Sequence, residues 1–126
     1  MIVLNTKAKE RSTYGLSLTF KDSSEEIIDP INIISCRWSL RDKHSGDIIN
    51  GRNKVSLNVD ENPKDLYLWG KDLALFASTN TSRIVTVEAT YNSDEGDNLP
   101  LIEEVEFPIE NFKYITYTTT TTTTTV

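Results

Sequence analysis

The chain has 126 residues, which is enough for one domain with a single hydrophobic core. Its net charge of −6 gives no general attraction to nucleic acid or to an anionic membrane surface, because both depend on clustered Lys and Arg side chains. The single cysteine, Cys36, excludes an intrachain disulfide and favours a protein made in a reducing cytoplasm. No apolar run reaches the length of a signal-peptide core or of a membrane helix.

The N-terminal part predicts an arm followed by a strand. Residues 1–12 are expected to form a leading arm, with a short strand at residues 2–4. Residues 13–21 (TYGLSLTFK) alternate between apolar and polar side chains, which is the period of a half-buried strand. The inward row of this strand is Tyr14, Leu16, Leu18 and Phe20. A polar loop ending at residues 29–30 follows it.

Residues 33–42 (IISCRWSLRD) show the clearest alternation in the chain. The pattern places Ile34, Cys36, Trp38 and Leu40 on one face, with Trp38 as the large central core residue, as in immunoglobulin-type domains. Residues 43–47 predict a hairpin turn in which Gly46 takes a positive φ. A short return strand is then expected at residues 48–49, followed by a turn at residues 50–51.

The middle of the chain predicts two further strands and one helical turn. Val55, Leu57 and Val59 alternate with polar residues. In residues 65–69, two leucines alternate with Tyr67 and Trp69. Residues 72–75 are expected to form a single helical turn that crosses from one sheet to the other, with Asp72 near its start.

Residues 83–112 predict the last two strands. We expect strands at residues 83–91 and 105–109, joined by a polar loop, with a β-bulge near residues 103–104 to bring Leu101 into phase. Pro108 lacks an N–H group, so the final strand is expected to lie at a sheet edge or to face solvent on that side. About seven short strands without an amphipathic helix indicate an all-β, immunoglobulin-like antiparallel β-sandwich over residues 13–113. A small closed barrel is the alternative.

Residues 114–126 form a threonine-rich C-terminal arm with eight consecutive threonines. By composition alone it is a disordered tail, because identical faces give a strand no preferred register. Threonine also favours extended backbone, so the alternative is an arm that lies against another subunit as an added strand.

No catalytic or metal site is expected. His44 shares a five-residue turn with Ser45 and Asp47, where the three side chains would diverge instead of forming a triad. Cys36 is in phase with Trp38 and is therefore expected to be buried, not reactive. With one Cys and one His, a zinc site is excluded, and no residue predicts a cofactor.

Two features leave binding open. The loop at residues 92–98 is rich in oxygen ligands but lacks the spacing of a helix-loop-helix calcium site; the alternative is a polar hairpin loop. Tyr67 and Trp69, if exposed on one strand, are suited to stacking on sugars. The favoured alternative is that they cover the end of the sandwich or lie in a protein interface.

The chain resembles small immunoglobulin-like virion proteins encoded by tailed bacteriophages. The resemblance is carried by WSLRD at residues 38–42 with Gly46 and ING at 49–51, and by KDLAL at 71–75. Its most specific part is VEATY at 87–91, NLPL at 98–101, Glu103-Glu104, and Phe107 through residues 110–111. These elements span residues 13–113, and the threonine tail lies outside them.

The resemblance implies a non-enzymatic structural protein that decorates or connects head, neck or tail and is assembled in the host cytoplasm. Its implied partners are capsid, portal, neck or tail subunits, in many copies, without nucleic acid or membrane. Docking is expected through strand edges and terminal arms, and the alternative is a carbohydrate- or receptor-binding module. The candidate interface residues are Tyr67, Trp69, Tyr114, Ile115, Tyr117, Thr118, Thr125 and Val126.

Overall fold

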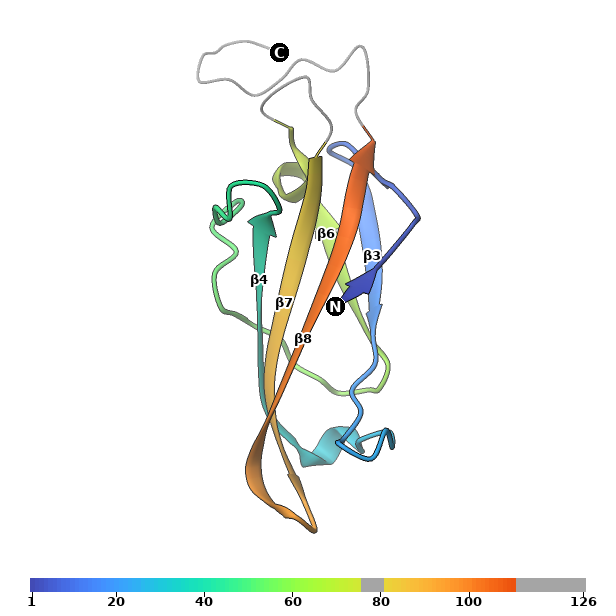
Figure 1. Ribbon diagram of the computed structural model, residues 1–126, viewed down its shortest axis with the longest axis vertical. Coiled ribbons are helices and arrows are strands. Elements are labelled where there is room, and N and C mark those ends of the chain that lie inside the picture. Colours follow the sequence, from blue (N-terminus) through green and yellow to red (C-terminus); the bar gives the residue numbers. More distant parts are fainter. Residues whose placement is uncertain (76–80, 111–126) are drawn as a thin grey trace.

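The computed structural model describes residues 1–75 and 81–110, which form two β-sheets packed face to face (Figure 1). This confirms the predicted all-β sandwich. Two short 3-10 helices, η1 (Pro30–Asn32) and η2 (Gly70–Leu73), lie between strands in this part of the chain. The strands are β1 (Ile2–Val3), β2 (Ala8–Lys9), β3 (Thr13–Leu18), β4 (Ile33–Asp42), β5 (Val55–Ser56), β6 (Lys64–Trp69), β7 (Thr81–Ser93) and β8 (Gly96–Glu110).

The larger sheet has the order β1-β8-β7-β4-β5, with β2 also paired to β8. Its centre is the long antiparallel hairpin of β7 and β8, whose turn extends beyond the ends of the other strands (Figure 1). The sequence pattern predicted a polar loop from residue 92 to 104, but most of that stretch belongs to β8. Its many polar side chains lie on an exposed hairpin, where a strand needs no apolar alternation.

The predicted bulge near residues 103–104 is wrong. The register of β7 with β8 runs without interruption from Val85–Val105 to Ala89–Leu101, and its one shift lies between Tyr91 and Ser93. Leu101 is therefore already in phase with Val105. A consequence is that Glu103 shares the inner face of the sheet with these two apolar residues.

The smaller sheet contains only β3 and β6, paired antiparallel from Thr13–Trp69 to Leu18–Lys64. Leu16, Leu66 and Leu68 point from it into the core, as the alternation predicted. The expected strand at residues 55–59 is reduced to the two residues of β5, although Val59 is still buried.

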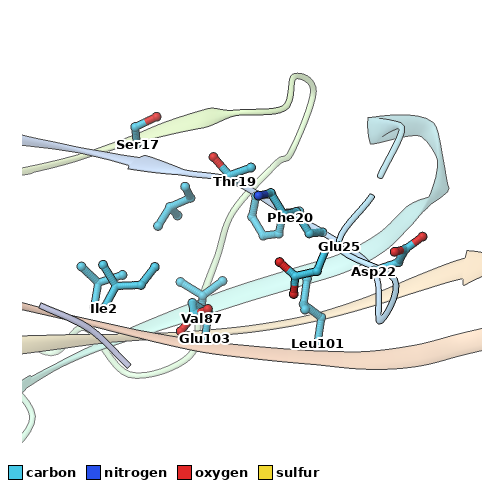
Figure 2. A pocket seen from close by; sticks show the side chains of 12 residues that line it. Ile2, Ser17, Thr19, Phe20, Asp22, Glu25, Val87, Leu101 and Glu103 are labelled. Atoms are coloured by element: carbon cyan, nitrogen blue, oxygen red, sulfur yellow. The ribbon is translucent and has the colours of Figure 1, made fainter. Parts of the chain in front are cut away.

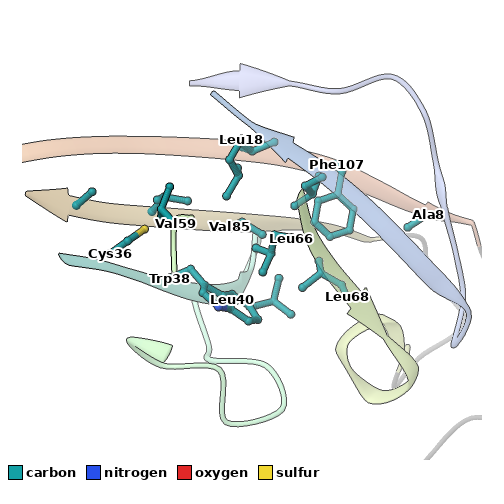
Figure 3. Close-up of a cluster of buried hydrophobic side chains, with 14 of the residues drawn as sticks. Ala8, Leu18, Cys36, Trp38, Leu40, Val59, Leu66, Leu68, Val85 and Phe107 are labelled. Atoms are coloured by element: carbon teal, nitrogen blue, oxygen red, sulfur yellow. The ribbon is translucent and has the colours of Figure 1, made fainter. Parts of the chain in front are cut away.

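The core lies between the two sheets (Figure 3). Trp38 is 5% exposed, which confirms its predicted central position, and it packs with Leu40, Val85 and Phe107 among others. Ile34, predicted to join this row, is half exposed because the register of β4 shifts between Ile33 and Ser35. A bulge of this kind changes which side chains face inward.

Residues 1–12, predicted as a separate arm, belong in large part to the larger sheet. β1 and β2 pair with β8 in parallel, and Ala8 is fully buried. The backbone N–H of Leu4 donates to the carbonyl of Glu106, so the backbone of Glu106 faces the edge of β8 where β1 and β2 lie. The backbone of Pro108, two residues later, faces the same edge. There, between the two short pairings, Pro108 stands where no partner strand accepts a hydrogen bond, and it has no N–H to leave unsatisfied.

The predicted turns are confirmed. Gly46 has φ +77°, and residues 50–51 both have positive φ. The helical turn expected at residues 72–75 is η2, which begins and ends two residues earlier, so Asp72 lies near its end; η2 follows β6 of the smaller sheet and precedes β7 of the larger one. The predicted C-terminal arm, including its start at residue 114, lies outside the described residues.

Candidate interaction surfaces

Tyr67 and Trp69 lie on the outer face of β6, where they are 53% and 55% exposed. The pleat of the strand separates them from Leu66 and Leu68, which point into the core. Two aromatic side chains two residues apart on one strand lie side by side on the same face. The structure therefore brings these two predicted site residues together on one surface.

Tyr67 already has a structural contact within the domain. It stands opposite Gly15 in the register of β3 and β6, and a Cβ atom on Gly15 would lie 3.1 Å from Cε1 of the tyrosine. The ring therefore lies over the glycine and covers backbone that no side chain of its own protects. Aromatic residues compensate for strand glycines in this way. One side of the tyrosine ring is thus unavailable to a ligand.

Trp69 takes part in a cluster around Arg52. The Cζ atom of Arg52 lies 5.5 Å from the ring centroids of both Trp38 and Trp69, so the guanidinium contacts one buried and one exposed indole. Its Nε donates to Oδ1 of Asp72 at 2.8 Å and its Nη2 donates to Oδ2 at 3.2 Å. A planar guanidinium can make both the stacking contact and the bidentate hydrogen bond at once.

Asp72 is the buried centre of that cluster. Its side chain is fully buried and also accepts from Asn50 Nδ2 at 2.9 Å and from the backbone N–H of Trp69 at 3.2 Å. Burial by itself would raise the pKa of Asp72, but the hydrogen bonds from Arg52, Asn50 and Trp69, with the positive charge of Arg52, lower it. Asp72 therefore remains ionised and ties the turn at residues 50–52 to η2. The sequence located Asp72 at the helical turn, but nothing in it indicated the partner Arg52.

A groove of about 400 Å³ opens on the other side of the sandwich, between the end of β3 and the β1–β8 edge (Figure 2). Its apolar part reaches the core residues Val87 and Val105. Its rim carries three carboxylates and one ammonium group. The residues that line it are Ile2, Ser17, Leu18, Thr19, Phe20, Lys21, Asp22, Glu25, Val87, Leu101, Glu103 and Val105.

The wall of the groove formed by residues 19–28 is held in place by Asn62. Asn62 Oδ1 accepts from the N–H of Phe20 at 3.1 Å, and its Nδ2 donates to the carbonyls of Phe20 and Ile28 at 2.9 and 2.8 Å. A further backbone hydrogen bond joins Ile28 N to Phe20 O. One side chain thus satisfies three backbone groups of a loop far from it in sequence. The sequence contained no signal for this contact, because an asparagine before a proline predicts only a turn.

The groove shows no arrangement for acid–base or nucleophilic chemistry. Of its carboxylates, Asp22 accepts hydrogen bonds from the backbone N–H groups of Ser24 and Glu26, which fixes a turn. Ser17 and Thr19 have no histidine near them, since the one histidine of the chain, His44, is in the turn after β4. The groove is therefore an apolar groove with an acidic rim.

The residues tested for catalysis have structural environments. Oδ2 of Asp42 accepts from the N–H of His44 at 3.1 Å and from both N and Oγ of Ser45, which organises the hairpin turn. Cys36 is buried, and burial raises the pKa of its thiol to about 11. Among the described residues, no three His, Cys, Asp or Glu side chains come close enough together to hold a metal ion.

The acidic turn at residues 92–98 is organised by its own side chains. Asn92 Oδ1 accepts from the N–H of Asn98, and Ser93 Oγ accepts from the N–H of Glu95. The turn is the tip of the β7–β8 hairpin, as the alternative interpretation of a polar hairpin loop has it.

Sequence patterns missed a buried arginine at the end of the core. Arg83 is 1% exposed, and its Nη2 donates to the carbonyl of Ala74 at 2.7 Å. Burial lowers the pKa of its guanidinium, against the opposing effect of Asp42 and Asp72. The signal that could have found it is its phase, because residue 83 alternates together with Val85 and Val87 on the inward face.

Six of the eight predicted interface residues lie outside the described residues: Tyr114, Ile115, Tyr117, Thr118, Thr125 and Val126.

Comparison of the chain with protein-family models, with curated proteins and with solved structures finds no match. In the part of the chain that the structure describes, no helix has the length and apolar character required to cross a membrane.

Proposed function

We propose that the protein is a non-enzymatic structural component of a tailed-phage virion, which decorates or connects head, neck or tail. The observation that carries an assembly role is the exposed apolar edge beside the groove. Ile2 is 48% exposed and lines the groove together with the apolar residues Leu18, Leu101 and Val105. A contiguous apolar surface of this kind on a small domain is typical of a protein interaction site.

The location of this surface supports the same function. β1 is an edge strand of the larger sheet and β3 pairs only with β6, so two strand edges border the groove. Unpaired backbone groups at such edges can accept a strand from another chain. Repeated docking of identical domains in a symmetric particle requires interfaces of this type. The assignment to a virion rests on the resemblance of residues 13–113 to phage proteins.

Charge argues for protein partners over nucleic acid or lipid. The net charge is −6, and the groove rim has three acids against one lysine. Neither phosphate backbones nor anionic headgroups are attracted to such a surface. The proposed partners are capsid, portal, neck or tail subunits in the assembling particle, and the proposed location is the virion, after synthesis in the host cytoplasm.

The test is the composition of purified particles. Particles are banded on a density gradient, and the chain is quantified by mass spectrometry against the major capsid protein. A fixed ratio across independent preparations and after a high-salt wash supports the proposal. A chain that stays in the soluble fraction, or whose ratio varies with washing, contradicts it.

The second candidate is a carbohydrate- or receptor-binding module. The exposed pair of Tyr67 and Trp69 on β6 favours it, because adjacent aromatic faces can stack on sugar rings. The contacts with Gly15 and Arg52 argue against it, since each ring already has one neighbour within the domain. Binding on a glycan array that is lost in Trp69→Ala and kept in Ile102→Ala, an exposed control far from β6, would establish this function instead.

A further inference from the structure

We propose that the groove binds the C-terminal segment 112–117 of a second copy of this chain, as an extended strand that closes the open side of the sandwich. This inference deepens the proposed function by naming the partner and its site. It rests on the shape of the groove, on the chemistry of the segment, and on the distance between the groove and the end of β8.

The groove has the form that an added strand requires. It separates the larger sheet, at β1 and β8, from the end of β3 in the smaller sheet, as Figure 2 shows with Ile2 and Leu101 on one side and Phe20 on the other. A strand placed outside β1 would direct every second side chain into the groove and the others to solvent. Large apolar side chains would then contact Leu18 and Phe20 from the open side.

β1 is the part of this edge that is suited to pairing. Further along, the same edge of β8 is protected: Pro100 has no N–H to donate, and Glu103 directs a carboxylate toward the inner face. β1 has neither feature, and its residues are apolar and about half exposed or more. The surface therefore favours an extended apolar segment at β1.

The segment that follows the described residues has the complementary chemistry. Residues 112–117 (FKYITY) contain four large apolar or aromatic side chains, three of them aromatic, and Phe112 and Tyr114 would share one face of a strand. Lys113 is the one charged side chain among residues 111–126, and it would lie on the opposite, solvent-facing side, so the face with Phe112 and Tyr114 carries no charge into the groove. Aromatic side chains are also enriched in the buried centres of protein interfaces.

Distance assigns the segment to a second copy. Val105, the lining residue nearest the end of β8, lies five residues before Glu110, or roughly 17 Å at about 3.4 Å per residue. From Glu110, the Cα atom of Phe112 can be at most about 7 Å away and that of Tyr114 about 14 Å. Neither Cα atom reaches the level of Val105 in its own domain, and the side chains of an extended strand stand perpendicular to it, so Phe112 and Tyr114 would enter the groove of a neighbour.

The test uses disulfide trapping between two full-length variants. Thr19→Cys places a thiol on the exposed groove wall, and Tyr114→Cys places one in the segment; Cys36 is buried and stays silent. The two proteins carry different tags and are mixed under mild oxidation. The inference expects a mixed disulfide at least tenfold more abundant than in a mixture of His44→Cys, an exposed turn outside the groove, with Tyr114→Cys.

Two outcomes would overturn the inference. One is a mixed disulfide no more frequent than with the His44→Cys control. The other is efficient intrachain linkage in the doubly substituted Thr19→Cys, Tyr114→Cys chain at high dilution, which would show that the segment reaches its own groove.

Self-association gives an independent measurement. Sedimentation equilibrium should show at least a tenfold weaker association for Phe112→Ser combined with Tyr114→Ser than for the matched control Thr120→Ser combined with Thr122→Ser. Equal association in the two variants contradicts the inference. The particle test separates this inference from the proposed function. If the chain is incorporated into particles but the mixed disulfide does not form, the proposed function stands and the inference fails. If the mixed disulfide forms but the chain is not incorporated, the self-association stands and the proposed function fails.

Discussion

Asp72 offers the sharpest test of the energetics, because one buried carboxylate accepts four hydrogen bonds. Replacing it with Asn preserves the shape but removes the charge that Arg52 needs, while Arg52 stays between two indoles. Removing one partner of a buried ion pair costs about 3–5 kcal/mol. The guanidinium side of this pair is a quarter exposed and can be hydrated, so we expect about 3 kcal/mol for Asp72→Asn.

Urea denaturation followed by tryptophan fluorescence is the suitable assay, since both tryptophans of the chain contact Arg52. A loss of about 3 kcal/mol corresponds to a fall in Tm of roughly 10 °C for a domain of this length. Asp60→Asn serves as the control, because it breaks an ion pair with Lys64 at the surface and should leave the transition unchanged. A loss below about 1 kcal/mol for Asp72→Asn would refute the view that this carboxylate holds η2 against the turn at residues 50–52.

The same residue predicts the pH dependence of stability. The folded-state pKa of Asp72 is lowered, so its contribution is complete above the unfolded-state pKa of about 3.9 and is lost as the pH falls through the folded-state value. The difference in unfolding free energy between the wild-type chain and Asp72→Asn should be constant from pH 5 to 7 and shrink below about pH 4. A difference that stays constant down to pH 2.5 would show that Asp72 does not titrate as the structure implies.

Three further predictions concern other contacts. Asn62→Ala should lower the free energy of unfolding by about 2–3 kcal/mol, because the N–H of Phe20 and the carbonyl of Ile28 lose their partner and the carbonyl of Phe20 loses one of two; an unchanged urea midpoint would contradict this role. Tyr67→Ala should cost about 1 kcal/mol through loss of the cover over Gly15, whereas Tyr67→Phe should be neutral; equal melting curves for the two variants would argue against the contact. Cys36 should react with a thiol reagent at pH 8 only in denaturant, because its pKa is about 11 and it is buried; rapid labelling of the folded chain would show that the core opens.

The fold was largely predictable because the alternation of apolar and polar side chains locates most of its strands and their inward faces. Leu66, Leu68, Val85, Val87 and Phe107 all face inward where a period of two placed them. The exceptions have local causes. The part of β8 before Val105 mixes Leu99, Leu101 and Ile102 with Gly, Pro and polar residues and lacks a clear alternation, so it resembles a loop. The bulge in β4 exposes Ile34 without any change of composition.

The candidate site was less predictable, because it depends on contacts between residues far apart in the chain. The groove is formed by Ile2, Phe20 and Leu101, among others, and each belongs to a different strand or loop. Asn62 and Arg52 likewise act on partners that are 20 to 42 residues away. A local pattern indicates which side a residue faces, but it does not identify the residue that it meets. Tyr67 and Trp69 were found from sequence because exposure on one strand is itself a local property.

The position of the groove follows from the unequal widths of the two sheets. At about 4.8 Å per strand, the two strands of the smaller sheet cannot cover a larger sheet that is five strands wide. On the β4 side, the cluster of Arg52 and Asp72 and the buried Val59 cover part of the remainder. On the β8 side, β1 contributes only two residues, and the inner face between Leu101 and Val105 stays open. One additional strand, apolar on one face, would complete the cover, and this is the position that the proposed segment of a second copy would take.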